Sequence, residues 1–365
     1  MGTTFELPSE YIAIVNADRA TLAQTLGWTL IRQVVYDVLC GENIRNLTEK
    51  LTPRRLAMLN AAFLVWLLDQ KDPDKLFEQA AKTLQGQNLA KAERWTAQWV
   101  LGLTDKARQN ILRDKSVAVD EYVREYRNTI REVAQESLNT FGELQGNLQI
   151  GSHGQSVEWQ FFLELLSAIG AQTLTVRGSE KSLYGKFFEP LVLGTLLHCL
   201  GFQMIPGPQK VPHNPQKVFW LSSQTQKRES DATLIYRPGK GVRFDIGFIG
   251  RGNPEISLDK VSRFERQSEI HDHAYDILTI ILVDRIGENS RIREQARLIH
   301  GYIVQMSMSF WPRNVAQILQ QEVGFTHPLL TLDTPDLSEY LRKCVALAPL
   351  ETFLFYGRHE ANSNE

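Results

Sequence analysis

Apolar residues recur at helical spacing through the first part of the chain. In the segment TLAQTLGWTLIRQVVYDVLC they stand four residues apart, at Leu22, Leu26, Leu30, Val34 and Val38, and this spacing predicts an amphipathic helix. The same periodicity continues in TPRRLAMLNAAFLVWLLDQ, ERWTAQWVLGL and VDEYVREYRNTIREVAQESL. Between residues 18 and 150 the prolines stand at positions 53 and 73, near expected helix ends. We therefore expect residues 1–150 to form a helical domain.

The pattern changes after the segment QGNLQIGSHGQSVEW, residues 145–159, where glycine and serine cluster and mark an expected domain boundary. Strands are then expected in a hairpin at 231–249 and at 277–284 and 301–309, and TLTVRG predicts a short strand or turn. Helices are expected over 157–169, 181–201, 254–270, 289–299 and 311–323. This alternation predicts an α/β domain over residues 151–365, with a mixed sheet and helices on both of its faces.

Composition and charge narrow the class of protein. Hydrophobic residues make up 43% of the chain and charged residues 22%, as in a soluble globular protein. The net charge is −2, so binding to a polyanion would need basic residues gathered on one face. Cys40, Cys199 and Cys344 are odd in number and lie in apolar surroundings, which favours reduced thiols in a cytoplasmic protein. The longest apolar runs, 61–68 and 277–283, are too short to span a bilayer, so we expect no membrane insertion.

The expected hairpin at 231–249 carries two acids. Asp231 opens its first strand, Asp245 lies inside the second, and the turn RPGKG joins the strands. Folding the strands back brings Asp231 level with residues 246–249 and places Asp245 diagonally across from it. Two carboxylates so close suit a hard divalent cation such as Mg²⁺, which keeps waters that can attack a phosphodiester. The alternative is a structural role, with Asp245 paired to Arg243 or Arg263.

A third acid lies on the helix expected before the hairpin. Glu189 stands at the margin of the apolar face of SLYGKFFEPLVLGTLLHCLGF, next to Phe188, and Pro190 follows it. A carboxylate at this margin needs a partner. It either faces the hairpin acids or forms a surface pair with Lys186 or Lys181.

Three motifs together resemble a known family. GKFFE on a helix, ESDAT opening a strand and RFDIGFIG on its hairpin partner are similar to the type II restriction endonucleases of the PD-(D/E)XK superfamily. The resemblance covers residues 180–311, where LVDRIGENSRIREQA and GYIVQMSMSFWP add to it, and the CfrBI-type group is the nearest. It implies a PD-(D/E)XK-like mixed sheet and a homodimer that uses Mg²⁺ to cut double-stranded DNA at a short palindrome, within a restriction-modification system.

The resemblance also assigns roles to the acids. Asp231 corresponds to the first metal-binding acid, Asp245 to the acid of the second strand, and Glu189 to a helix acid that assists them. The chain departs from the family pattern at two positions. Ser230 replaces a proline, which is a mild change, and Gly247 replaces the lysine expected two residues after the second acid.

The missing lysine at Gly247 should have a substitute, because a cation near the scissile phosphate stabilises charge and orients the attacking water. Lys240 in the turn is too far from Asp231 along the strand. Lys260, in the helix expected after the hairpin, could return its ammonium group to the carboxylates, and Lys227 is the next candidate. The alternative for Lys260 is a surface ion pair with Glu255 or Asp259.

Basic residues suggest where DNA could bind. Arginines cluster around the expected site and could contact phosphates or guanine edges, or simply be solvated, at Arg228, Arg251, Arg263 and Arg266. In the helical domain, which could dimerise or clamp DNA, Arg54 and Arg55 stand at a helix start. A solvated face is the favoured alternative there.

The leading hypothesis is a Mg²⁺-dependent, site-specific DNA endonuclease. Its alternative, favoured by Gly247, is a catalytically inactive protein of the same fold that binds DNA without cutting it. A third interpretation is a helical interaction protein joined to an unrelated α/β domain, which predicts no affinity for DNA.

Overall fold

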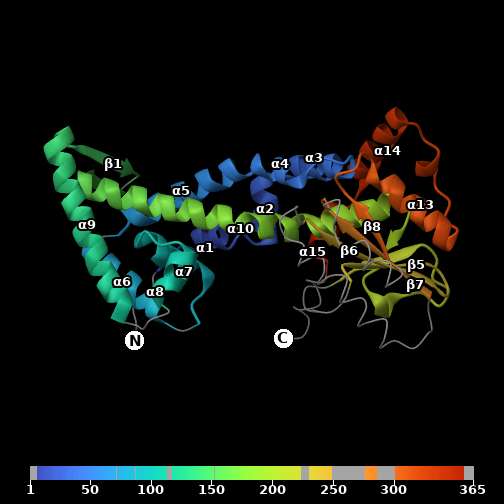
Figure 1. The fold of residues 1–365 in the computed structure, drawn as a ribbon, viewed down its shortest axis with the longest axis horizontal. Helices are drawn as coiled ribbons and strands as arrows, with labels where there is room; N and C mark the ends of the chain where they lie inside the picture. The colour runs from blue at the N-terminus through green and yellow to red at the C-terminus, as the bar shows by residue number, and fades with distance from the viewer. Residues whose placement is uncertain are drawn as a thin grey trace. The chain divides into compact units, whose positions relative to one another are not determined.

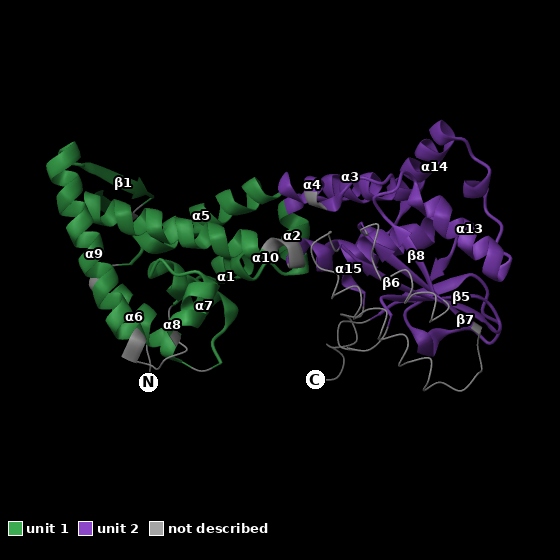
Figure 2. Ribbon diagram, in the orientation of Figure 1, with its two compact units in different colours: residues 1–25, 51–181 green, residues 26–50, 182–365 purple. Residues whose placement is uncertain are grey.

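A computed structural model describes residues 6–70, 72–86, 88–112, 117–151, 153–222, 230–248, 276–285 and 301–356. The chain forms two compact units (Figures 1 and 2). Residues 1–25 and 51–181 make up the first, the helical unit, and residues 26–50 and 182–365 make up the second, the sheet unit. Each unit is therefore built from two separate stretches of the chain. The expectation of a functional division near residue 150 stays a prediction.

The helical unit contains most of the expected N-terminal helices. They are α1 (Ser9–Asn16), α2 (Arg19–Leu26), α5 (Thr52–Leu68), α6 (Pro73–Gln85), α7 (Lys91–Val100), α8 (Asp105–Leu112) and α9 (Val117–Phe141). Pro53 lies in the first turn of α5 and Pro73 is the first residue of α6. Proline is tolerated there because the N–H groups of the first turn have no hydrogen-bond partner within the helix. The prediction of an N-terminal helical region is confirmed.

Aromatic residues from several helices form the core of the helical unit. The Phe63 ring lies 5.7 Å from Trp66 and 6.3 Å from Trp99, and Trp95 lies 5.7 Å from Trp99. Phe63, Trp66 and Trp99 are buried together with many aliphatic side chains. Large rings bury much apolar area per residue, so this cluster explains how short helices hold together in one unit.

Two elements near the expected boundary differ from the prediction. The glycine-rich segment forms a hairpin of β1 (Gly146–Ile150) and β2 (His153–Val157), and its turn uses Gly151 at a φ of +60°. The segment TLTVRG is helical, inside the continuous helix α10 (Trp159–Cys199, Figure 1). Val176 is fully buried in the core of the helical unit, and Thr175 Oγ1 donates to the Ala171 carbonyl at 2.8 Å. Packing and this bond outweigh the strand preference of β-branched residues.

The sheet unit contains a mixed sheet. Among the described residues it has six strands in chain order, β3 (Gln203–Met204), β4 (Val218–Leu221), β5 (Ala232–Arg237), β6 (Lys240–Gly247), β7 (Asp276–Val283) and β8 (Gly301–Gln305). Strands β4, β5 and β6 are antiparallel neighbours, while β6, β7 and β8 run parallel. The carboxyl ends of β6, β7 and β8 therefore meet at one edge of the sheet, and β5 begins there.

Helices accompany this sheet, as the sequence predicts for a mixed α/β fold. The later ones are α13 (Trp311–Val323), α14 (Thr334–Leu347) and α15 (Leu350–Phe355), with short 3-10 turns at Pro208–Lys210 and Pro328–Leu330. The Phe353 ring of α15 lies 6.3 Å from Phe219 of β4. Tyr302 of β8 donates a 2.6 Å hydrogen bond to Glu322 of α13. The helices expected over 254–270 and 289–299 lie outside the described residues.

An N-terminal segment completes the sheet unit. It contains α3 (Trp28–Leu39) and α4 (Ile44–Glu49). Trp311 Nε1 donates to the Val38 carbonyl at 2.7 Å, and the Arg32 guanidinium donates to the Val345 carbonyl at 2.6 Å. Gly41 lies where a Cβ would come within 2.6 Å of the Met308 carbonyl oxygen. Residues 26–50 are thus built into the fold of the C-terminal part of the chain.

Candidate active site

Asp231 is held on both sides at the start of β5. Its backbone carbonyl accepts a 3.0 Å hydrogen bond from the Ser222 N–H, and its Oδ2 accepts a 2.8 Å bond from the Ile246 N–H. Just before it, the buried Ser230 places Oγ 3.1 Å from Thr233 Oγ1, and its carbonyl accepts a hydrogen bond from Ser222 Oγ. The bond from Ile246 orients the carboxylate, and the other bonds hold the backbone around it. Ser230 therefore shapes the strand start where the family pattern has proline.

Asp245 lies inside β6 and is only 7% exposed. Phe244 and Ile246 on either side of it are fully buried, and because side chains alternate along a strand, they point to the opposite face from Asp245. Arg243 shares the face of Asp245 and pairs in register with Thr233. The geometry therefore allows the alternative in which Arg243 forms an ion pair with Asp245.

The hairpin register brings Asp231 and Asp245 to the same level. Ala232 pairs with Phe244, so the next position on each strand places the two acids opposite one another. The sequence predicted a diagonal arrangement instead. The turn is tighter than expected, because Arg237 pairs with Lys240 across Pro238 and Gly239, and a bulge between Ile235 and Arg237 shifts the register.

Two facing carboxylates have a defined chemistry. Directly opposite residues in an antiparallel pair have Cβ atoms about 4.5–5.5 Å apart. At that separation two ionised carboxylates repel each other unless a cation lies between them or one takes up a proton. Hard oxygen ligands of this kind fit Mg²⁺ or Ca²⁺. Within the described ranges, no group of three or more His, Cys, Asp or Glu side chains could hold a metal ion. Among these residues, Asp231 and Asp245 are therefore the two carboxylates that a metal at this site would bind.

Glu189 lies on α10 within the same unit. It is half-buried, and Phe187 and Phe188 just before it are buried, which confirms the expected apolar face. Its Oε1 lies 3.9 Å from the position that a Cβ on Gly185 would take, so the side chain folds back along its own helix. Its role as assisting acid, or as a partner of Lys186 or Lys181, stays a prediction.

Several expected site residues lie outside the described residues. They include the displaced lysine and the arginines expected to contact DNA, namely Lys260, Lys227, Arg228, Arg251, Arg263 and Arg266. The turn lysine is described. Lys240 pairs with Arg237 at the far end of the hairpin, away from Asp231, so it cannot replace the lysine missing at the buried Gly247.

Sequence reasoning missed a further acid at the same edge of the sheet. Asp284 follows β7 directly and is 3% exposed. Its Oδ2 accepts a 3.3 Å hydrogen bond from Asn43 Nδ2, and its carbonyl accepts a 3.1 Å bond from the Ser307 N–H. The signal in the sequence was an acid directly after the apolar run ILTIILV. Asp284 links the N-terminal segment of the sheet unit to the edge at which Asp231 and Asp245 lie.

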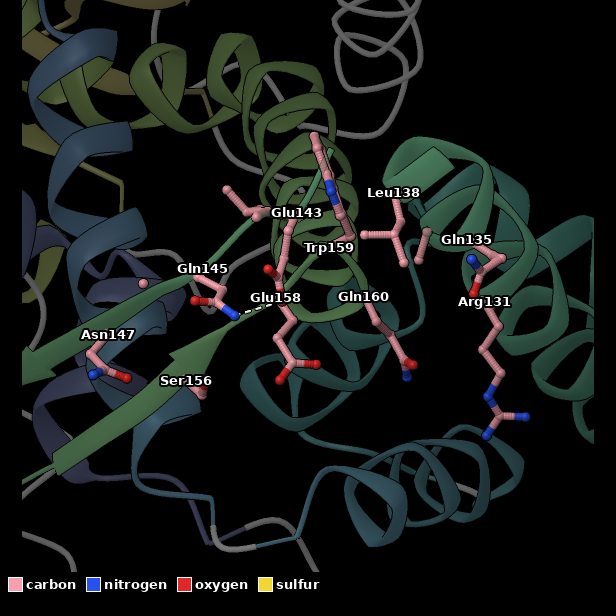
Figure 3. A pocket seen from close by; sticks show the side chains of 13 residues that line it. Arg131, Gln135, Leu138, Glu143, Gln145, Asn147, Ser156, Glu158, Trp159 and Gln160 are labelled. Carbon is pink, nitrogen blue, oxygen red and sulfur yellow. Dashed lines mark hydrogen bonds between the residues drawn. The ribbon is translucent and has the colours of Figure 1, made fainter. Parts of the chain in front are cut away.

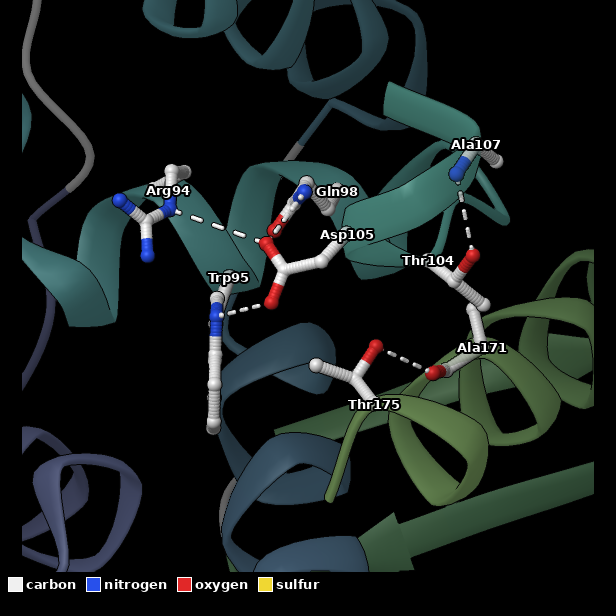
Figure 4. Close-up of polar contacts among 8 residues, drawn as sticks. All are labelled: Arg94, Trp95, Gln98, Thr104, Asp105, Ala107, Ala171 and Thr175. Atoms are coloured by element: carbon white, nitrogen blue, oxygen red, sulfur yellow. Dashed lines mark hydrogen bonds and ion pairs between the residues drawn. The ribbon is translucent and has the colours of Figure 1, made fainter. Parts of the chain in front are cut away.

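The helical unit also has polar features. Asp105 is held at the start of α8 by Trp95 Nε1 and Gln98 Nε2, both at 3.1 Å, and by Arg94 at 3.9 Å (Figure 4). Arg55, one of the two arginines at the start of α5 that could clamp DNA, is only 3% exposed and cannot reach a phosphate on the surface. Arg54 beside it is exposed.

A hollow in the helical unit has a volume of about 730 Å³. The β1–β2 hairpin, the end of α9 and the start of α10 surround it (Figure 3). Glu143 and Glu158 line it together with Arg131 and several amide side chains, so it offers little attraction to phosphate groups. This hollow belongs to the helical unit, whereas the hairpin acids belong to the sheet unit.

None of the described helices is both long and apolar enough to cross a membrane.

Comparisons with known proteins agree with the motifs. The family model described as CfrBI restriction endonuclease matches residues 29–291. The chain is 38% identical over 337 residues to the type II restriction enzyme CfrBI of Citrobacter freundii, which covers 91% of this chain and 92% of that enzyme. No solved structure matches the chain.

Proposed function

The chain belongs to the CfrBI restriction endonuclease family and is a site-specific DNA endonuclease of a restriction system, and we propose that Asp231 and Asp245 form its catalytic centre. The resemblance predicted from the motifs is thereby confirmed, and membership of the family favours cleavage over the inactive alternative. One observation supports the catalytic centre above all. The register and the Ile246 N–H hold the two carboxylates opposite one another at the edge of the sheet.

We propose the PD-(D/E)XK fold for the sheet unit. Its support is the order of elements, in which α10 precedes antiparallel β4, β5 and β6 and the parallel strand β7 follows. Asp231 at the start of one hairpin strand and Asp245 near the end of the other support this proposal, since the resemblance assigns the metal-binding acids to these two positions.

The carboxylates of Asp231 and Asp245 would hold the metal, for which we propose Mg²⁺. When bound, Mg²⁺ supplies a Lewis acid and lowers the pKa of a coordinated water. Asp231 keeps one orientation because Ile246 and Ser222 anchor it on both sides. Asp245 is almost fully buried, and in such surroundings its negative charge attracts a bound cation more strongly than it would in water.

Two further residues complete the proposed centre. Lys260 would stabilise the charge that develops on the scissile phosphate, in the role of the lysine absent at Gly247. Glu189 would assist from α10 as a third acid. The arginines near the hairpin, Arg228, Arg251, Arg263 and Arg266, would contact phosphates or base edges.

The proposed substrate is double-stranded DNA carrying a short palindrome, cut in both strands by a homodimer. A palindrome has a two-fold axis, and a homodimer with the same symmetry presents one catalytic centre to each strand. The helical unit would serve the dimer contact or grip the DNA backbone. A cytoplasmic location belongs to the same proposal.

Cleavage of plasmid and phage DNA by the purified full-length protein tests the proposal. We expect discrete fragments in Mg²⁺, no cleavage in EDTA, and DNA binding without cleavage in Ca²⁺. Cleavage that continues at full rate in EDTA would contradict the metal centre. Specific binding without cleavage in every divalent metal tried would contradict the catalytic assignment.

A further inference from the structure

Two of the three cysteines meet in the sheet unit although they are far apart in the sequence. Cys199 is the last residue of α10, and Cys344 lies in α14. All three cysteines are free thiols. The spacing of the cysteines along the chain does not indicate that Cys199 and Cys344 share one site.

Tyr340 positions the two cysteines. Its hydroxyl donates a 2.8 Å hydrogen bond to the Cys199 carbonyl, one of the carbonyls that a helix end leaves without a partner within the helix. Cys344 follows Tyr340 by four residues, one helical turn, and therefore lies on the same side of α14. The bond from Tyr340 to Cys199 thus brings this side of α14 to the end of α10, where Cys199 and Cys344 are neighbours close enough to affect each other's ionisation.

His327 completes this cluster. Its Nδ1 accepts a 3.3 Å hydrogen bond from the Leu329 N–H, and its Nε2 lies 3.2 Å from the Tyr340 hydroxyl. A neutral imidazole that accepts at Nδ1 carries its proton on Nε2, so Nε2–H donates to the Tyr340 oxygen while the Tyr340 O–H donates to Cys199. This chain of bonds holds Tyr340 against the Cys199 carbonyl, and with it the turn of α14 that carries Cys344.

The two thiols differ in exposure and acidity. Cys199 is 1% exposed, whereas Cys344 is half-buried. Hydrogen bonding to Cys344 and burial raise the pKa of Cys199 well above its usual value. Hydrogen bonding to Cys199 lowers the pKa of Cys344 to about 7, against the effect of burial. A reachable thiol that ionises near neutral pH beside a buried thiol is the arrangement of an attacking and a resolving cysteine.

We propose that Cys344 and Cys199 form a redox-active dithiol that exchanges with low-molecular-weight disulfides and closes into an intramolecular disulfide. The Cys344 thiolate attacks one sulfur of the small disulfide, which releases one small thiol and leaves a mixed disulfide on Cys344. The Cys199 thiol then loses its proton and attacks the Cys344 sulfur, which releases the second small thiol. The protein gives up two electrons and two protons, and the small disulfide is reduced to two thiols.

The disulfide would join the C-terminal end of α10 to α14. Helix α10 also carries Glu189, ten residues before Cys199, so oxidation would tie the far end of that helix in place. The dithiol itself does not depend on the proposed catalytic centre. Disulfide formation is measured by the mass and the melting temperature of the protein. The test therefore gives a result even if the enzyme does not cut DNA.

The test treats the folded full-length enzyme with oxidised glutathione and follows intact mass and thiol-trapped peptides. We expect the wild type to lose the mass of two hydrogens, to yield a linked Cys199–Cys344 peptide, and to melt at a higher temperature until dithiothreitol is added. Cys199→Ser should stop at a stable glutathione adduct on Cys344. Cys199→Ala provides the same readout if the serine variant folds poorly. Cys40→Ser, at the third cysteine, should behave as the wild type.

Two results would overturn the proposal. One is a glutathione adduct on Cys344 that persists in the wild type without closing. The other is a linked peptide that forms only after the protein is unfolded in urea.

Discussion

The backbone N–H of Ile246 donates a 2.8 Å hydrogen bond to Oδ2 of Asp231. The bond ties the first acid of the hairpin to the strand that carries the second acid, so the two carboxylates keep one relative position before DNA arrives. A hydrogen bond from a fixed backbone donor costs no reorganisation during the reaction. The proposed catalytic centre can therefore be tested by changes that keep this bond.

Asp231→Asn and Asp245→Asn are the first such changes. Asparagine keeps an acceptor oxygen but removes the charge that would hold the metal, a contribution of several kcal/mol to transition-state stabilisation. We expect plasmid cleavage to fall at least about 100-fold for each variant, since each factor of ten corresponds to about 1.4 kcal/mol. Gel assays of cleavage in Mg²⁺ and of binding in Ca²⁺ measure the two effects separately. The matched control is Glu322→Gln, an exposed acid of the same unit, and equal loss in that control would point to a general fault in folding.

Lys260→Ala tests the displaced lysine. The variant should lose cleavage and keep DNA binding in Ca²⁺, because a cation at the scissile phosphate acts mainly in the transition state. Lys240→Ala is the control, since Lys240 lies at the far end of the hairpin and should tolerate the change. Near-normal cutting by Lys260→Ala would reject this residue and direct attention to Lys227.

Gly194→Ala should destabilise the sheet unit. A Cβ at this position would come within 2.6 Å of the Phe353 ring, and both residues are buried. Overpacking of this kind costs about 1–3 kcal/mol. Chemical denaturation of the full-length protein should show a lower free energy of unfolding than that of the wild type.

Gly170→Ala in the same helix is the control. A Cβ there meets no atom within 4 Å, and alanine is favoured over glycine inside a helix by about 0.5–1 kcal/mol. The two glycine variants should therefore change stability in opposite directions. A shared direction would contradict the packing of Phe353 on α10.

The stability of the enzyme should fall as the pH drops below neutral, with His327 as one cause. Burial, with a smaller contribution from Lys217, lowers the pKa of His327 from 6.5 to about 4. Between pH 6.5 and 4 the unfolded chain binds a proton that the folded chain does not. The contribution of His327 is therefore present above pH 6.5 and is lost as the pH falls toward 4. Urea titrations at pH 7 and pH 5 should show a larger loss for the wild type than for His327→Gln, and parallel losses would exclude His327 as a cause.

The sequence predicted local elements better than the contacts between them. The hairpin, the two acids on it and the helix Trp311–Val323 follow from local patterns, because alternation and capping act over a few residues. The register of Asp231 against Asp245 depends on a bulge and a tight turn, which the alternation of side chains does not specify. The helical state of TLTVRG depends on a core assembled from distant helices.

Long-range contacts set the remaining features. Nothing near Asn43 in the sequence indicates that its amide reaches Asp284, and the spacing of Cys199 and Cys344 gives no sign that Tyr340 joins them. Such contacts exist only once the sheet and its helices have packed. A single sequence therefore supplies the candidate residues, and the folded chain decides which of them meet.

The N-terminal segment of the sheet unit also has a consequence for synthesis on the ribosome. Arg32 is made early, but its partner carbonyl on Val345 is 313 residues further along the chain. At about 5–20 residues per second, roughly 15–60 s pass before that partner emerges. The segment around α3 must wait unassembled for that time, and a truncated translation product lacks the helices on which it packs. A cell that makes this nuclease therefore obtains a finished sheet unit only from chains translated almost to their end.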